Sequence, residues 1–355
     1  INQLNLVKNM NSPDRKGIQS LWDILDKTKT AIGKRVLRTN LLNPIVDISE
    51  LNSRYNLLEN FISGDVYLEV RNMLKNIVDI ERLHRKMAMK IMNPSSFISL
   101  DMSYINIKNL VTYLRQNKSI SSIIPPQEVL DTFDEFINDY NSKLIMGNLH
   151  GVNINGITDP IFTRGLYPAI DKVADKILWH KKFLTTFTQT ICDYANTRLP
   201  KSVNNFIVLK RNDRDGHYFH TTKARAKNLK KLFDAHEGEK QFEFMVGDKN
   251  IKIKFAELNI KTLNAAIKIN HPMIRNYSQL LASYEVQLAK LSLVEFAALL
   301  STYYIKYNIA LEQISKFVGF ADFISNLAHV SYNNGYFKPT IEKRDCGYFK
   351  ATELR

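Results

Sequence analysis

The chain has 355 residues, and its 49 Lys and Arg against 35 Asp and Glu leave a net charge of +14 with histidine neutral. Apolar content of 45% and charged content of 24% exclude wholesale disorder, and 13 Gly with 10 Pro exclude collagen-like and low-complexity proteins. The length predicts two or three domains or one large helical array. The charge predicts an anionic partner, which leaves nucleic acid, a membrane surface and an acidic protein open.

Helical periodicity dominates the first 145 residues. Apolar residues at three- and four-residue spacing predict one amphipathic helix over residues 13–42, a second after Ser49 and a third over residues 67–92. A further helical run ends at Pro125-Pro126, and another helix covers residues 127–144. Residues 146–168, rich in Gly and Pro, predict a loop or a short β-hairpin.

The composition changes after Pro200. Residues 203–209, 217–222 and 242–254 favour strands, in two hairpins with turns at residues 213–216 and 247–250. Long helices over residues 168–198 and 272–332 bracket these hairpins. We therefore expect a mainly α fold: a helical core over 1–168, an outgoing helix over 169–200, an inserted small α+β module over 201–275 and a returning antiparallel helix within 276–355.

Candidate catalytic and metal-binding patterns are missing from the sequence. It has no GxxxxGK[ST], HExxH or GxSxG motif. His217 and His220 lie three apart on an expected strand, so their side chains point to opposite faces and cannot share a metal ion. We expect no catalytic residue, no metal and no cofactor, and hence no enzyme activity, in this segment.

The basic residues concentrate in the inserted module. Residues 201–275 hold 16 Lys and Arg against 8 Asp and Glu, more than half of the excess charge. Such a cluster suits contacts to a phosphate backbone, and a solubilising surface is the alternative. Aromatic neighbours such as Tyr218, Phe219 and Phe233 are expected in the module's core, with stacking on bases as the alternative. The candidate nucleic-acid contacts are Lys210, Arg211, Arg214, Lys223, Arg225, Lys227, Lys261, Lys268 and Arg275.

The compartment follows from the two cysteines. Cys192 and Cys346 are far apart and outside any CxxC motif, which indicates a reducing, intracellular compartment. No apolar stretch reaches the roughly 18 residues that span a bilayer, so we expect no membrane.

Several segments resemble the MutS mismatch-repair family, in the family's order. LWDILDKTKTAIGKRVLR at 21–38 and LLNPIVDI at 41–48 are similar to its core signature, and so is LKNIVDIERL at 74–83. GHYFHTTK at 216–223 and KTLNAAIKINHP at 261–272 are similar to its clamp motifs. YFKPTI at 336–341 is similar to the approach to its ATPase domain. Within these motifs we expect close helix packing at Gly33, and intramolecular ion pairs and hydrogen bonds among Arg35, Arg38, Asp79, Glu81 and Arg82.

The resemblance implies a core with two long antiparallel lever helices and an inserted clamp. In the family, the clamp grips double-stranded DNA without reading sequence, and the levers couple it to an ATPase domain. The full-length protein would then bind ATP and Mg²⁺, recognise mismatched DNA or recombination intermediates, and pair with another MutS-type subunit as a homo- or heterodimer. The alternative is a helical protein–protein contact or dimerisation scaffold without DNA binding.

The sequence also departs from the family pattern. Ile267 and Lys268 stand where the family carries Glu and Arg, and residues 237–254 do not match its usual clamp sequence. Such divergence is typical of a viral or organellar branch.

Overall fold

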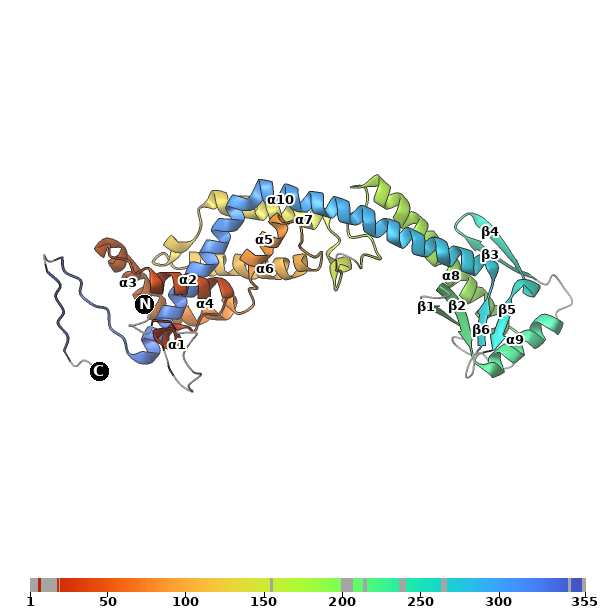
Figure 1. Cartoon of the computed structure of the whole chain (residues 1–355), viewed down its shortest axis with the longest axis horizontal. Helices are drawn as coiled ribbons and strands as arrows, with labels where there is room; N and C mark the ends of the chain where they lie inside the picture. Colours follow the sequence, from red (N-terminus) through yellow and green to blue (C-terminus); the bar gives the residue numbers. More distant parts are fainter. Residues whose placement is uncertain are drawn as a thin grey trace. The chain divides into compact units, whose positions relative to one another are not determined.

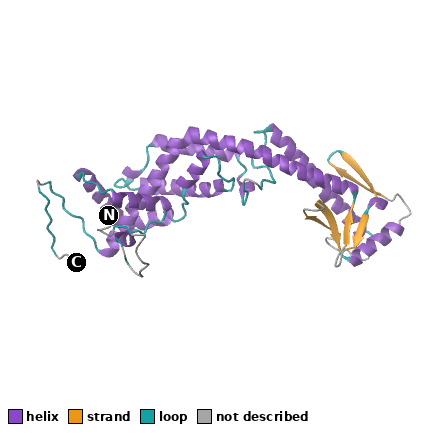
Figure 2. Ribbon diagram, in the orientation of Figure 1, coloured by secondary structure: helices purple, strands orange, loops and turns teal. Residues whose placement is uncertain are grey.

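The computed structural model describes residues 6, 7, 18, 20–153, 156–198, 207–212, 216–235, 241–262, 267–343 and 346–352. These residues form a mainly α protein with small antiparallel sheets (Figures 1 and 2), as predicted. The chain divides into two compact units. Unit 1 comprises Ile1–Ser142, Leu149–Gly151 and Ala297–Arg355, and unit 2 comprises Lys143–Asn148 and Val152–Phe296.

The described elements follow one another in a simple order. The helices are α1 (Leu21–Leu25), α2 (Ala31–Leu42), α3 (Ile48–Ile62), α4 (Val66–Leu74), α5 (Ile80–Ala88), α6 (Ser96–Arg115), α7 (Gln127–Lys143), α8 (Pro168–Asn196), α9 (Lys223–Ala235) and α10 (Pro272–Asn334). The strands are β1 (Val208–Asn212), β2 (Gly216–Thr221), β3 (Gln241–Val246), β4 (Lys249–Lys254), β5 (Asn259–Thr262) and β6 (Ile267–Asn270). Short 3₁₀ turns cover Ser63–Asp65, Ser121–Ile123, Met146–Leu149 and Phe255–Glu257.

The single helix predicted over residues 13–42 is wrong, because the described part is divided between α1 and α2. The Thr30 hydroxyl accepts a hydrogen bond from the Gly33 amide (2.9 Å) and so caps the start of α2. Asn326 of α10 holds the connection: its side chain accepts from the Lys27 amide (2.9 Å) and donates to the Leu25 carbonyl (2.8 Å). Residues 13–17 and 19 of the predicted helix lie outside the described residues.

The single helix predicted over residues 67–92 is also two helices, α4 and α5. Asp79 stands between them as the N-cap of α5, where its carboxylate accepts from the Arg82 amide (3.2 Å). The same carboxylate binds both terminal nitrogens of Arg35 (2.7 and 3.0 Å), and Glu81 binds Arg35 as well (2.8 Å). Of the expected interactions, the Arg35 ion pairs and the hydrogen bond from the Arg82 amide are therefore confirmed. The hydrogen bond to Arg35 holds the pKa of Asp79 below its usual value.

An aromatic cluster forms the core of unit 1 between α6, α7 and α10. Its members are fully or almost fully buried. Phe136 touches four of them, with ring centres 6.0 Å from Tyr104, 5.2 Å from Tyr140 and Tyr303 and 5.0 Å from Tyr307. The Tyr140 hydroxyl donates to Asp101 (2.6 Å), so this buried polar group is satisfied.

The expectation of no membrane-length apolar segment is wrong for α10. Among the described residues, only this helix is long and apolar enough to cross a membrane by length and composition, with a mean hydropathy of 1.3 over 18 residues, a third of which are buried. Its apolar side chains pack inside both units, for example Leu288 in unit 2 and Ile314 in unit 1.

Unit 2 holds both sheets and more structure than the sequence predicted. β3 and β4 form the expected hairpin, with Gly247 (φ 59°) in the turn. The other sheet has the order β1-β2-β6-β5, with all neighbours antiparallel. α9, β5 and β6 were not predicted. Residues 146–168 contain a short helical turn and one bridge between Leu144 and Phe162, in place of a hairpin.

Candidate nucleic-acid interface

The four-stranded sheet of unit 2 has one buried face. Phe219 and Thr221 of β2 and Ile269 of β6 are buried on it. The Phe187 ring of α8 lies against Phe219, with ring centres 5.2 Å apart. Since alternate residues of a strand point to opposite faces, Arg211 and His217 belong to this same face.

The two histidines of β2 confirm the predicted separation. His217 faces α10, where its backbone amide donates to the Ser278 hydroxyl (2.7 Å) and its Nδ1 lies 2.9 Å from the same oxygen. Burial and, next, the nearby Arg211 guanidinium lower the pKa of His217. His220 lies on the other face of the sheet, directly opposite Lys268 of β6.

Arg211 is a structural residue in this arrangement. Its Nη1 lies 3.0 Å from the Glu285 carboxylate of α10, and the Glu285 side chain is only 11% exposed. A carboxylate taken out of water needs a charged partner. Arg211 thus holds β1 against α10, although its own side chain is 48% exposed.

The other face of the sheet carries basic and aromatic side chains. Lys210 of β1 lies opposite Tyr218 of β2, and His220 lies opposite Lys268. The Lys268 Nζ sits 4.2 Å from the Tyr218 ring centre, a cation–π contact. Lys210 is exposed, whereas Lys268 is largely buried at the centre of the sheet.

A stripe of lysines on α9 forms a second basic surface. The helix buries Ala226, Leu229 and Phe233, and Phe233 stacks on Phe255 with ring centres 4.5 Å apart. The exposed lysines recur at i, i+4, i+7 and i+8, so they share the side of α9 away from that contact. We call this set the α9 lysine stripe: Lys223, Lys227, Lys230 and Lys231. No ion pair to any of them occurs within the described part of the chain.

The remaining sequence-predicted contacts are scattered. Arg225 is partly buried and lies on the other side of α9 from Lys223 and Lys227. Arg275 is exposed in the first turn of α10. The backbone of Lys261 pairs with Lys268 across β5 and β6, and Arg214 lies outside the described residues.

Five lysines in the described part of the inserted module, residues 201–275, are absent from the predicted contact set. Lys230 and Lys231 complete the α9 lysine stripe, and the helical recurrence of apolar residues at 226, 229 and 233 is the signal that could have revealed them. Three more lie on β4, where Lys249 sits over the Trp179 ring (5.3 Å) and Lys252 pairs with Glu243 (3.3 Å). Lys254 is exposed at the end of that strand.

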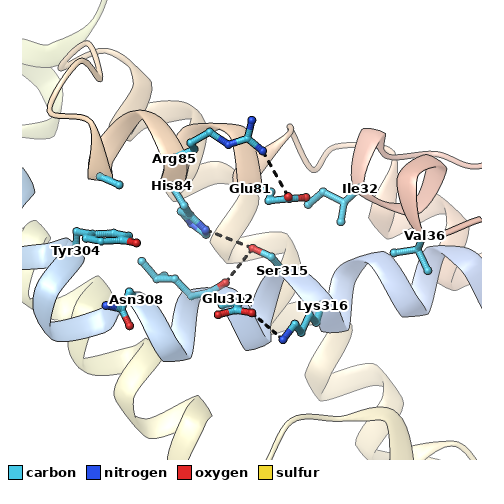
Figure 3. Close-up of a pocket in the computed structure, with 12 residues that line it drawn as sticks. Ile32, Val36, Glu81, His84, Arg85, Tyr304, Asn308, Glu312, Ser315 and Lys316 are labelled. Atoms are coloured by element: carbon cyan, nitrogen blue, oxygen red, sulfur yellow. Dashed lines mark hydrogen bonds and ion pairs between the residues drawn. The ribbon is translucent and has the colours of Figure 1, made fainter. Parts of the chain in front are cut away.

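Unit 1 contains a groove of about 520 Å³ between α2, α5 and α10 (Figure 3). Glu81 and Arg85 line it from α5, and Glu312 and Lys316 from α10. The buried His84 ring lies beneath them, with Nδ1 3.3 Å from the Ser315 hydroxyl. Across the described residues, no group of three or more His, Cys, Asp or Glu side chains could hold a metal ion.

These features define a class of protein: a mainly helical chain with a basic α+β module inserted between two long helices. The family model described as MutS domain III matches residues 1–328. The chain therefore belongs to the MutS family, as its motifs predicted.

Known relatives agree with this membership. The chain is 31% identical over 363 residues to a "Putative DNA mismatch repair protein mutS homolog" of Acanthamoeba polyphaga mimivirus. This match covers all of the chain and 32% of the viral protein. It is 25% identical over 349 residues to the DNA mismatch repair protein MutS of Borrelia garinii subsp. bavariensis, and this match covers 96% of the chain and 35% of the relative. The corresponding protein of Leuconostoc mesenteroides is 24% identical over 344 residues, with 95% and 35% covered. The chain is therefore a divergent member that spans about a third of the length of these relatives.

Proposed function

We propose that unit 2 is a clamp that grips duplex DNA through its phosphate backbone, without reading sequence. The observation that carries this proposal is the α9 lysine stripe, four exposed ammonium groups on one side of a helix that is anchored by its other side. Membership of a family whose relatives are named DNA mismatch repair proteins supports it.

The geometry of the stripe suits a polyanion with closely spaced charges. At a rise of 1.5 Å per residue, Lys223 and Lys231 lie about 12 Å apart along α9. Duplex DNA carries one negative charge per roughly 1.7 Å of its axis, so about seven phosphates fall within that distance. Each lysine therefore finds a phosphate whatever the base sequence.

The test compares two double variants that lower the net charge equally. Lys227→Gln with Lys231→Gln removes half of the α9 lysine stripe, and Lys75→Gln with Lys118→Gln removes two exposed lysines of unit 1. Duplex affinity is measured by fluorescence anisotropy over a series of salt concentrations. The stripe variant should lower the slope of log affinity against log salt by about 1.8, since each phosphate contact contributes about 0.9. Equal slopes in the two variants would reject the clamp assignment.

We further propose that α10 couples this grip to an ATPase domain elsewhere in the full-length protein, where ATP and Mg²⁺ would bind. The single helix α10 contributes residues to unit 2 and to unit 1, so both units share one helical segment of backbone. Val294 is an exposed residue close to the point where the helix passes between the units. Val294→Pro breaks the helix there, and Val294→Ala keeps it. DNA should alter ATP hydrolysis by the full-length alanine variant and not by the proline variant; an equal response in both contradicts coupling.

A second candidate function is contact with another MutS-type subunit through unit 1. Ile305 and Ile309 of α10 are 75% and 70% exposed and precede the groove residues Glu312 and Lys316 by one to three turns. Glu312 and Lys316 form an ion pair within the chain (2.7 Å). In a two-fold contact between copies the same patch meets itself, because an isologous interface is self-complementary, so these opposite charges of the two copies can face one another. Ile305→Glu with Ile309→Glu should turn a dimer into a monomer in sedimentation velocity. A dimer unaffected by this change removes the groove from the interface.

A further inference from the structure

The β3–β4 hairpin forms a two-stranded sheet of its own (Figure 2). One of its faces is anchored on α8, where Phe244 of β3 packs on the rings of Phe183 and Phe187, with ring centres 5.9 and 5.2 Å apart. Ile251 and Ile253 of β4 are buried on the same face. This apolar face fixes the hairpin within unit 2.

The outer edge of β4 carries backbone groups that β3 does not use. Val246 and Lys249 flank a two-residue turn and pair with each other, so they exchange backbone hydrogen bonds, and every second pair after them does the same. Asn250 and Lys252 belong to the pairs between, so their N–H and C=O groups point away from β3. Within the described part of the chain, no strand pairs with β4 on that side. Such an edge is a template for a further strand.

Lysines follow this edge at the period of the strand. Lys252 and Lys254 are two residues apart, so both side chains lie on the exposed face of the hairpin, about 7 Å apart. Lys252 lies opposite Glu243 of β3 with its Nζ 3.3 Å from the carboxylate, and its side chain is 56% exposed. An exposed pair of this kind is worth little, so Lys252 can exchange its partner. No ion pair to Lys254 occurs among the described residues.

These features favour a peptide over nucleic acid as the ligand. An extended peptide presents N–H and C=O groups in alternation and can satisfy both kinds of group on the β4 edge, as in β-strand addition. A phosphate backbone offers acceptors only, so the outward carbonyl groups of Asn250 and Lys252 would face its negative oxygens. Two copies of β4 paired about Lys252 or Ile253 would set lysine against lysine, and like charges directly opposite each other are destabilising.

We infer that the outer edge of β4 binds an extended acidic segment of a partner protein by strand addition. The backbone of that segment pairs with Asn250 and Lys252, and its acidic side chains, at alternate positions, lie against Lys252 and Lys254. Apolar side chains at the intervening positions extend the face that Ile251 and Ile253 bury. The site is distinct from the α9 lysine stripe and does not depend on the proposed duplex grip.

The experiment measures fluorescence anisotropy of a short labelled peptide, in which valine and glutamate alternate, titrated with the 355-residue chain. Lys252→Glu with Lys254→Glu should weaken binding about tenfold, because two cross-strand pairs of opposite charge become pairs of like charge. The same variant should gain affinity for a peptide in which lysine replaces glutamate. The matched control is Lys172→Glu with Lys182→Glu, two exposed lysines of α8, which should leave the affinity unchanged.

A second measurement separates strand addition from charge attraction alone. The glutamates of the bound peptide lie opposite the lysines of β4, so their amides point to the edge, whereas the valine amides point away from it. N-methylation of the glutamate amides should abolish binding, and N-methylation of the valine amides should preserve it. Adding Glu243→Lys to the charge-reversed variant keeps the cross-strand ion pair of the hairpin, and circular dichroism checks that the variant is folded.

Three results would overturn the inference. One is equal binding of the two N-methylated peptides, which would reduce the contact to charge attraction. Another is an unchanged affinity for the valine–glutamate peptide in the folded, charge-reversed variant. The third is a lower salt slope of duplex binding in that variant without any effect on the peptide, which would assign β4 to the DNA-binding surface. The duplex grip is tested separately by the variants of the α9 lysine stripe, so either proposal can fail while the other stands.

Discussion

Gly33 of α2 lies directly against Asp322 of α10, so closely that a Cβ atom on the glycine would overlap the aspartate carboxyl group. The Asp322 carboxylate accepts hydrogen bonds from the backbone amides of Lys29 (3.0 Å) and Thr30 (2.7 Å) and from the Thr30 hydroxyl (2.7 Å). One side chain, 292 positions away in sequence, thereby satisfies three donors at the start of α2. Glycine at position 33 is what allows the two backbones this approach.

Gly33→Ala should therefore destabilise unit 1. The added methyl group must displace the Asp322 carboxylate from its three donors, and overpacking of this kind costs about 1–3 kcal/mol. Urea unfolding followed by circular dichroism measures the loss. Gly147→Ala is the matched control, because a Cβ atom there meets nothing within 4 Å. Equal stability of the two variants would contradict the close packing.

The buried His84 should make stability depend on pH. Its Nε2 lies 2.7 Å from the Tyr104 hydroxyl, and burial lowers its pKa from 6.5 to about 3. Between these values the unfolded chain binds a proton that the folded chain does not, so the free energy of unfolding falls as the pH falls from 6.5 towards 3. The contribution is up to about 1.4 kcal/mol per pH unit.

His84→Gln removes this titration and should flatten the decline in unfolding free energy across that window. Ser315→Ala keeps the imidazole and loses only its hydroxyl neighbour, so it should retain the slope of the unmodified protein. The comparison is made by chemical denaturation at several pH values. A His84→Gln variant with an unchanged slope would show that His84 does not contribute.

The ion pair between Arg211 and Glu285 predicts that substitution of Arg211 lowers the stability of the fold, although the sequence alone assigned this residue to DNA contact. Arg211→Ala leaves the largely buried Glu285 carboxylate without its partner, which should cost about 2 kcal/mol. Adding Glu285→Gln removes the unpaired charge and should restore part of the loss. Thermal unfolding provides the measurement, with the exposed Arg275→Ala as control. No destabilisation by Arg211→Ala would return Arg211 to the set of candidate contacts.

Lys227 and Arg225 should differ in their effect on duplex binding, although they are two residues apart. Lys227 belongs to the α9 lysine stripe, and Arg225 lies on the other side of the helix, partly buried. Lys227→Gln should lower the salt slope of duplex affinity by about 0.9, and Arg225→Gln should leave it nearly unchanged. The reverse order would place the DNA on the other side of α9.

Local chemistry was enough to predict several features. Pro168 and Pro272 each stand at the first position of a helix, where proline is preorganised, so the starts of α8 and α10 follow from the sequence. The period of two in a strand placed His217 and His220 on opposite faces. The core motif identified the family across most of the chain. The division at Asp79 and the helix α9 also have local signals in the sequence: an N-cap residue for the first, and an apolar period for the second.

The composition of each surface could not be predicted in this way, because it depends on contacts between distant residues. The break between α1 and α2 is held by Asp322 and Asn326, nearly 300 positions away. The pairing of β2 with β6 spans about 50 residues, and strand periodicity does not identify a partner. The amino-acid composition of residues 201–275 was enough to predict the excess of lysine and arginine in this module. Tertiary packing then separated them: Arg211 faces a buried carboxylate, Lys210 and Lys268 border two rings, and four lysines line one side of α9.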